Sequence, residues 1–193
     1  MLATILKYHL FSHCQHTPPL PEGVDWNVLM SEAKIQAVEA LLYDAIKAME
    51  LSIPREILFQ LSSNVATIES DNRKREQALS DLAYLANKEA GLFLTVVKGS
   101  SLARLYPNPI HRECGDNDLY MGSSATSLDS LVASHGLEVD QKDPRHSSFI
   151  FHGVVFENHA YLLYPSTPGD TSSEPEWKKE SHQHLPLQVL CQV

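Results

Sequence analysis

Apolar residues recur at three- and four-residue steps through the first half of the chain, a pattern typical of amphipathic helices. After the proline-rich segment HTPPLPEG, this spacing predicts one helix through residues 28–49, capped by Asp25 or Asn27. A second, longer helix is predicted to begin after Pro54 and to end at Gly91, because proline suits a first helical turn and glycine a helix end. The N-terminal half is therefore expected to be helical.

The later part of the chain shows shorter apolar runs typical of β-strands. The segment LFLTVV, residues 92–97, is too short for a helix and predicts a buried strand that ends at Lys98-Gly99. Ser100 is predicted to cap the short helix SLARLY, which the sequence PNP stops. The next predicted elements are a strand at 117–121 and a helix at 123–136 closed by Gly136.

The segment HSSFIFHGVVFENHAYLLY predicts a β-hairpin. Its first strand is expected to run to about Phe151, its turn to lie at His152-Gly153, and its second strand to run from Val154 to about Leu163. The order of elements predicts an α+β protein with a small mixed β-sheet and an N-terminal helical region. The sequence favours three parts: helices at 1–90, an α/β core at 91–165, and a polar loop with a shortened C-terminal segment at 166–193.

Charge and cysteine content narrow the classes of partner and compartment. Among 193 residues, 15 basic and 24 acidic side chains give a net charge of −9, which argues against a surface that coats nucleic acid. The three cysteines are far apart and form no Cys-x-x-Cys pair, so neither a disulfide framework nor a zinc knuckle is indicated. No apolar run approaches the roughly 18 residues that span a bilayer, and a soluble, cytoplasmic protein without a membrane partner is expected.

Two carboxylates one residue apart are the first candidate for chemistry. In a strand, Asp116 and Asp118 would project from the same face with their Cα atoms about 7 Å apart, a spacing that suits oxygen ligands of Mg²⁺. The alternative is an ordinary surface turn, since Gly-Asp-Asn is common in loops. The segment does not fit a calcium-binding loop, because its sixth position is Met121 and its twelfth is Ser127.

A glycine-serine turn precedes these aspartates. Gly99-Ser100 joins a predicted strand to a predicted helix, and backbone N–H groups at such a turn can bind an anion. Ser100 can be a helix cap, a phosphate ligand or both. The stretch KGSS lacks the order and the upstream glycine of a P-loop, and the chain contains no G-x-G-x-x-G, H-E-x-x-H or G-x-S-x-G motif.

Taken together, the order strand, Gly-Ser, short helix, arginine and Gly-Asp-x-Asp-Leu is similar to the nucleotidyltransferase superfamily with the polymerase-beta type fold. The stretch VVKGSSLARLYPNPIHRECGDNDLYM resembles an uncharacterised bacterial branch that reads roughly Leu-Lys-Gly-Ala-Ala-Leu, Leu-Tyr-Pro, Arg, Gly-Asp-Ile-Asp-Leu. VVFENHAYL matches the Glu-x-His of that branch on a later strand. The resemblance covers roughly residues 25–165.

The resemblance implies a role for each matching residue. It assigns Gly99 and Ser100 to the β- and γ-phosphates of a nucleotide, Asp116 and Asp118 to Mg²⁺ or Mn²⁺, and Glu157 to the third carboxylate, as metal ligand or general base. Two ions in such a site neutralise the triphosphate and activate an attacking hydroxyl for displacement at the α-phosphorus. From the residues alone, the alternative for Glu157 is an ordinary outward-facing glutamate on a strand.

Other residues near these motifs have open roles. Lys98 and Arg112 match basic positions of the branch and are expected to bind phosphate or to pair with a nearby acid. His159 has the parity of Glu157 and is either an acceptor-site group or a structural histidine. His182 and His184 in the tail are expected to be incidental to function, and Cys114 to pack as a small apolar group.

Two features depart from the branch. The residue between the aspartates is usually apolar because it points into the core, and here it is Asn117, whose amide would need buried hydrogen-bond partners. The sequence ends near LPLQVLCQV, where the branch continues into further helices, so a short member or a chain cut before those helices is expected.

Three functions remain from the sequence. The leading one is metal-dependent transfer of a nucleoside monophosphate from an NTP, with ATP favoured, to an unidentified hydroxyl of a small molecule or protein. The second is an inactive nucleotide- or partner-binding module of the same fold. The third is a glycosyltransferase that holds a nucleotide diphosphate through Asp-x-Asp and Mg²⁺, although the Rossmann-like nucleotide half is missing.

Overall fold

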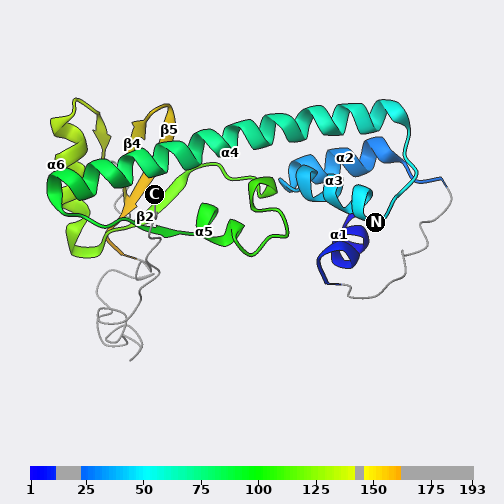
Figure 1. Ribbon diagram of the computed structural model, residues 1–193, viewed down its shortest axis with the longest axis horizontal. Coiled ribbons are helices and arrows are strands. Elements are labelled where there is room, and N and C mark those ends of the chain that lie inside the picture. The colour runs from blue at the N-terminus through cyan, green and yellow to red at the C-terminus, as the bar shows by residue number, and fades with distance from the viewer. Residues whose placement is uncertain (12–22, 142–145, 162–193) are drawn as a thin grey trace. The chain divides into compact units, whose positions relative to one another are not determined.

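The computed structural model describes residues 1–11, 23–141 and 146–161 (Figure 1). The chain forms two compact units. The first unit comprises Met1–Glu76 and Ser100–Gly115, and the second comprises Gln77–Gly99 and the described residues from Asp116 onward. One helix, α4 (Arg55–Ala90), runs through the boundary between them. Within the described ranges, no helix combines the length and the apolar character needed to cross a membrane.

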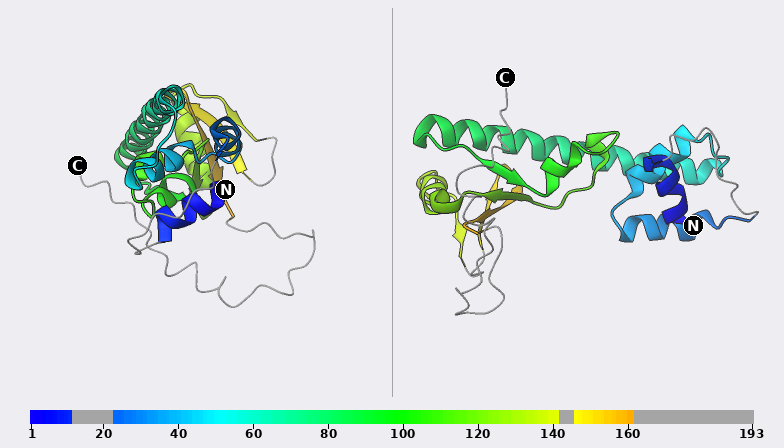
Figure 2. Two further views of the ribbon diagram at one scale, coloured as in Figure 1. Left: turned by 90° about the vertical axis from the view of Figure 1, so that its right-hand side faces the viewer. Right: turned by 90° about the horizontal axis from the view of Figure 1, so that it is seen from below.

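The first unit is a group of helices (Figure 2). These helices share an apolar core. Its first three helices are α1 (Leu2–Phe11), α2 (Trp26–Ile35) and α3 (Glu39–Ala48). They pack against the first turns of α4 through buried Ile5, Leu42 and Leu61. The short helix α5 (Gly99–Ala103) and the 3₁₀ turn η1 (Pro109–His111) follow later in the chain.

The prediction of one continuous helix at 28–49 is wrong. The helix breaks between α2 and α3, where Ala37 adopts a φ of 53°, in the left-handed region that few non-glycine residues enter. The break allows both helices to bury apolar side chains in one core, which a single straight helix of that length cannot do. The predicted cap is confirmed, because Asp25 Oδ1 accepts hydrogen bonds from the backbone N–H groups of Asn27 (3.0 Å) and Val28 (3.2 Å).

A buried histidine ties together distant segments of the first unit. His111 Nδ1 lies 2.7 Å from Asp44 Oδ2, and His111 Nε2 lies 3.0 Å from Glu69 Oε1. Burial lowers the pKa of His111, but the hydrogen bonds and charges of Glu69 and Asp44 outweigh this effect, so its pKa is raised above 6.5. The hydrogen bond from His111, followed by that from Arg73, lowers the pKa of Glu69.

These shifts predict a pH-dependent contribution to the stability of the unit. A raised pKa means that charged His111 stabilises the folded chain below pH 6.5 and that this contribution disappears as the pH rises through the folded-state pKa. We expect His111→Gln to lower the free energy of unfolding by about 1–2 kcal/mol at about pH 5.5 and by less at about pH 9.

Chemical unfolding at both pH values checks this expectation. His135→Gln is the matched control, because His135 also pairs with a glutamate, Glu89, but is exposed. A loss of stability in His111→Gln that is the same at both pH values would contradict the assignment.

The second unit is built on a five-stranded mixed sheet with the strand order β1-β2-β5-β4-β3. The strands are β1 (Thr95–Val97), β2 (Asn117–Tyr120), β3 (Val139–Asp140), β4 (His146–Phe151) and β5 (Val154–His159). Strands β2 and β5 are parallel, and the other neighbouring pairs are antiparallel. The predicted α+β class with a small mixed sheet is therefore confirmed.

One face of this sheet is covered by helices, as Figures 1 and 2 show. The second half of α4 and helix α6 (Ala125–Ser134) bury Leu82, Leu128 and Val132 together with Leu119 and Phe156 of the sheet. Side chains alternate along β4 and β5, so the opposite face carries polar groups such as Glu157 and His159 together with exposed Ile150 and Val155. The predicted ends of these helices are confirmed in both cases, since the glycine after each has a positive φ, 63° at Gly91 and 79° at Gly136.

The covered face also holds a small polar cluster. Asn158, at 1% exposure, donates from Nδ2 to Ala125 O (2.9 Å) and to Asp129 Oδ1 (2.8 Å). Ser147 Oγ donates to the same oxygen at 2.7 Å. These donors compensate for the burial of the Asp129 carboxylate, so the cluster joins α6 to the hairpin.

Three predicted element boundaries differ from the structure. The second strand of the hairpin, predicted to run to about Leu163, ends at His159. The strand predicted at 92–97 is shorter, because β1 contains only Thr95–Val97. The prediction that Ser100 caps the following helix is wrong, since α5 already begins at Gly99. Lys98, with a φ of 55°, turns the chain one residue earlier than the sequence suggested.

Candidate functional site

The register of the sheet gathers polar side chains on its uncovered face. Asp118 of β2 pairs directly with Glu157 of β5, and Tyr120 pairs with His159 two residues further on. Residues paired across neighbouring strands point to the same face, as do residues two apart along a strand. Asp118, Glu157 and His159 therefore share a face, opposite to the one that buries Phe156 and Asn158.

Asp118 is the centre of this group. Its carboxylate is almost fully buried, and Oδ1 lies 2.6 Å from Lys98 Nζ and 3.1 Å from His159 Nε2. The hydrogen bond to Asp118 raises the pKa of Lys98, against the opposing effect of burial, and the charges of Asp118, Glu157 and Asp116 raise it further. The pKa of Lys98 is thus raised by all three carboxylates named from the sequence.

The strand-to-helix turn at Lys98-Gly99 is positioned next to these acids. Lys98 follows the end of β1, whose residue Val97 pairs with Asp118. Gly99 is buried, and a Cβ added to it would lie 3.4 Å from the backbone oxygen of Asp116. The positive φ of Lys98 is the kind of local strain that recurs at ligand-binding turns.

Asp116 is placed by a bend and not by strand alternation. Strand β2 begins at Asn117, so Asp116 lies immediately before it and is partly exposed. Asn117 is completely buried, which confirms that the residue between the two aspartates points into the core. The acid on the strand, Asp118, therefore has the more rigid position of the two.

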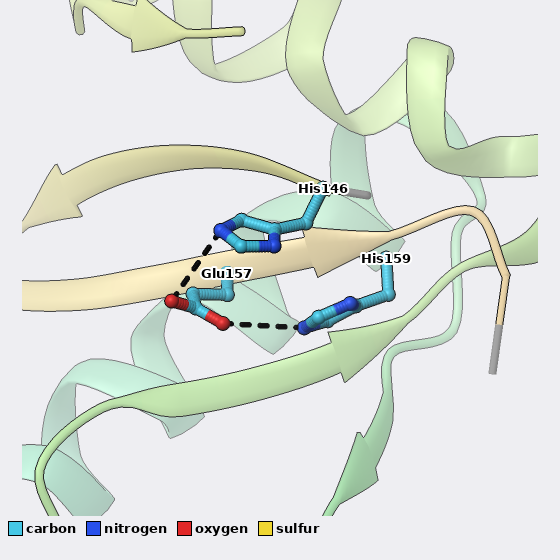
Figure 3. Close-up of side chains that lie close together, drawn as sticks. All are labelled: His146, Glu157 and His159. Atoms are coloured by element: carbon cyan, nitrogen blue, oxygen red, sulfur yellow. Dashed lines mark ion pairs between the residues drawn. The ribbon is translucent and has the colours of Figure 1, made fainter. Parts of the chain in front are cut away.

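A histidine that the sequence did not single out completes the uncovered face. His146 of β4 pairs with His159 across the hairpin, and its Nε2 lies 3.4 Å from Glu157 Oε1. His159 Nε2 lies 3.3 Å from Glu157 Oε2, so the glutamate stands between two imidazoles (Figure 3). The predicted turn at His152-Gly153 already implied this pairing, because a two-residue turn sets the register of the whole hairpin.

The acidic residues named from the sequence offer the ligand type that suits a hard divalent cation. The carboxylates of Asp116, Asp118 and Glu157 supply the oxygen ligands that Mg²⁺ and Mn²⁺ prefer. Their combined effect on Lys98 shows that the field at this end of β2 attracts positive charge. The residues present are therefore compatible with the ion that the family generally uses.

The other residues predicted for the site are divided between the two compact units of the chain or lie outside the described residues. Ser100 and Arg112 belong to the first unit, whereas Lys98, Gly99 and the three carboxylates belong to the second. Arg112 donates from Nη1 to Cys114 Sγ at 3.0 Å, and its guanidinium carbon lies 6.0 Å from the centre of the Tyr106 ring. His182 and His184 lie outside the described residues.

Comparison with known proteins agrees with the sequence resemblance. A family model described as an uncharacterised nucleotidyltransferase matches residues 22–192, which include all five strands of the sheet. No curated protein and no solved structure matches the sequence. Because the match spans most of the chain, the protein belongs to this family of uncharacterised nucleotidyltransferases.

Proposed function

We propose that the protein transfers a nucleoside monophosphate from an NTP, with ATP the first candidate, to a hydroxyl group of a small molecule or protein. The observation that carries this proposal is the direct pairing of Asp118 with Glu157 on the uncovered face, beside Lys98. Family membership supports the reaction type. The geometry supports the location, since Asp118 pairs with Glu157 across β2 and β5 and also contacts the ammonium of Lys98.

Asp116, Asp118 and Glu157 are proposed to hold Mg²⁺ or Mn²⁺, which when bound neutralises the triphosphate and activates the attacking hydroxyl. In that role the fixed strand positions of Asp118 and Glu157 keep their oxygens at the same place before substrate arrives. His159, which lies within 3.3 Å of both carboxylates, orients them. Glu157 serves as a metal ligand or as the base for the acceptor hydroxyl.

The nucleotide is proposed to lie against the turn that follows β1. Gly99 gives phosphate oxygens access to backbone N–H groups, and Lys98 can move from Asp118 to a phosphate because its side chain is largely exposed. Ser100 and Arg112 enter this proposal through the family resemblance. Lys98 keeps its positive charge and a negatively charged partner when it moves from Asp118 to a phosphate, so this exchange has little electrostatic cost.

One observation favours a second candidate, an inactive nucleotide- or partner-binding module. Asp118 Oδ1 is already engaged by Lys98 and His159, so the charge of this acid is compensated within the chain. If Asp118 binds a metal for catalysis, its Oδ1 must first give up its contacts with Lys98 and His159. The two candidates differ in whether pyrophosphate is released.

The test is to incubate the full chain with Mg²⁺ or Mn²⁺, each NTP in turn, and pools of hydroxyl-bearing metabolites or candidate proteins, and to measure pyrophosphate. We expect release that depends on metal, NTP and acceptor. A rise in melting temperature with NTP and metal, but no pyrophosphate with any acceptor, would favour the binding module. If NTP with metal neither raises the melting temperature nor gives pyrophosphate, both nucleotide transfer and nucleotide binding are contradicted, which leaves only partner binding.

A further inference from the structure

We propose that His146, Glu157 and His159 form a binding site for a first-row transition-metal ion of the Zn²⁺ class. The three residues come from the two strands of one hairpin, and each offers one ligand atom. These atoms lie within 4.8 Å of one another. Figure 3 shows the three side chains, with an ion pair from Glu157 to each imidazole. The site would be additional to the ion proposed at Asp116 and Asp118, and only Glu157 belongs to both groups.

The distances match those expected between ligands of a tetrahedral ion. Zn²⁺ bonds of about 2.0–2.1 Å at tetrahedral angles place neighbouring ligand atoms about 3.4 Å apart. Glu157 Oε1 lies 3.4 Å from His146 Nε2, and Glu157 Oε2 lies 3.3 Å from His159 Nε2. With one ligand atom taken from each residue, all three atoms lie within 4.8 Å of one another, so a bound ion would draw them together by rotation of the carboxylate and a small movement of the imidazoles.

The ligand types point away from Mg²⁺. Imidazole nitrogen is a good ligand for Zn²⁺, Co²⁺, Ni²⁺ and Cu²⁺, whereas Mg²⁺ prefers oxygen and keeps much of its water. Two of the three ligand atoms are imidazole nitrogens. We therefore expect selectivity for transition metals even when Mg²⁺ is in large excess.

The backbone gives the site a rigid frame. His146 and His159 are directly paired residues, and their ring centres lie 4.9 Å apart. Glu157 is two residues from His159 on the same face, so the three side chains project together from adjacent strands. Sites built on paired strands hold their ligands more precisely than sites on loops.

The site remains accessible and leaves a position for a further ligand. The side chains of His146, Glu157 and His159 are 14%, 25% and 16% exposed, so solvent reaches the group. Three protein ligands leave the fourth tetrahedral position open, as in catalytic metal sites. Binding at His159 Nε2 would replace its hydrogen bond to Asp118 and place the new ion beside that carboxylate. Use of the open position by the acceptor hydroxyl rests on the proposed function, but the metal site itself does not.

The experiment measures metal binding to the metal-stripped full chain without nucleotide. Co²⁺ is titrated and followed by its visible absorption, and Zn²⁺ affinity is then obtained by competition with a chromophoric chelator, all in excess Mg²⁺. We expect one equivalent with Co²⁺ bands typical of nitrogen ligation. His146→Ala and Glu157→Gln should each weaken the affinity by more than about a hundred-fold, beyond the range for loss of an outer hydrogen-bond partner.

Two variants serve as controls. His135→Ala removes a histidine that pairs with Glu89 at 2.8 Å but belongs to no such group of three among the described residues, and this variant should bind the metal normally. The double variant His182→Ala/His184→Ala removes the histidines of the tail and should also bind normally. Loss of binding in either control, or no binding to the unaltered chain, would overturn the assignment.

His146→Cys keeps the assignment testable if His146→Ala fails to fold. A thiolate can replace imidazole as a ligand of Co²⁺ and Zn²⁺, so this variant should retain metal and add a sulfur-to-cobalt charge-transfer band. A folded His146→Cys variant that binds Co²⁺ without such a band would overturn the proposal. Because no step measures pyrophosphate, failure of the proposed transfer reaction would not alter these results.

Discussion

Asp118→Asn is expected to lower the rate of metal-dependent pyrophosphate release by about a thousand-fold. The substitution keeps the shape of a side chain that is only 4% exposed, but it removes the negative charge that pairs with Lys98 and that we propose holds the metal. Removing one electrostatic element of a preorganised site commonly costs about 10²–10³-fold in turnover, and a metal ligand belongs at the upper end. Steady-state pyrophosphate release under saturating NTP measures the effect.

The matched control is Asp81→Asn, because Asp81 is also a carboxylate paired with a histidine, His152, in the same unit. It should retain full turnover. A second measurement uses mass action: NTP with Mg²⁺ at a hundred times the dissociation constant should stabilise the chain by about 2.7 kcal/mol. The double variant Asp116→Asn/Asp118→Asn should abolish this stabilisation, and an unchanged effect would place the nucleotide elsewhere.

Gly99→Val is expected to weaken NTP binding by about a hundred-fold or more. The physical reason is that branched methyl groups at the turn after β1 would occupy the space through which phosphate approaches the backbone N–H groups. Gly99 is already buried, and the first added carbon would lie 3.4 Å from Asp116 O. Calorimetric titration with a non-hydrolysable NTP analogue gives the affinity.

Gly99→Ala separates exclusion of phosphate from damage to the fold. Its single Cβ makes an ordinary contact with Asp116, so the ligand-free melting temperature should change little while the affinity falls. Ser100→Ala should cost only about ten-fold in affinity, since it removes one hydroxyl donor and leaves the backbone donors. Normal NTP affinity in Gly99→Val would remove this turn from the nucleotide site, and normal affinity in Ser100→Ala would remove the hydroxyl alone.

Only some residues of the candidate site could be predicted from the sequence. Alternation along a strand predicts that Glu157 and His159 share a face, and the hairpin turn implies the partner of His159. His146 was nevertheless missed, because a single histidine at the start of an apolar run gives no signal until its partner across the turn is considered. Lys98 was expected to bind phosphate or to pair with an acid, but the choice of Asp118 had no local signal, since Lys98 follows β1 and Asp118 lies on the neighbouring strand β2.

The sequence by itself determined the long helix α4, the hairpin, and the α+β class. Pro54 and Gly91 act within one helical turn of themselves, and the two-residue turn at His152-Gly153 acts on the strands directly attached to it. These are local effects that arise from backbone geometry and side-chain spacing.

Only the tertiary structure decided that β2 lies parallel to β5 and so brings Asp118 beside Glu157. It also decided the break at Ala37, which lets side chains of both short helices pack in the core of the first unit. Strand order and helix packing depend on which distant apolar faces can be buried together, and a periodicity of two or four residues carries no information about that choice.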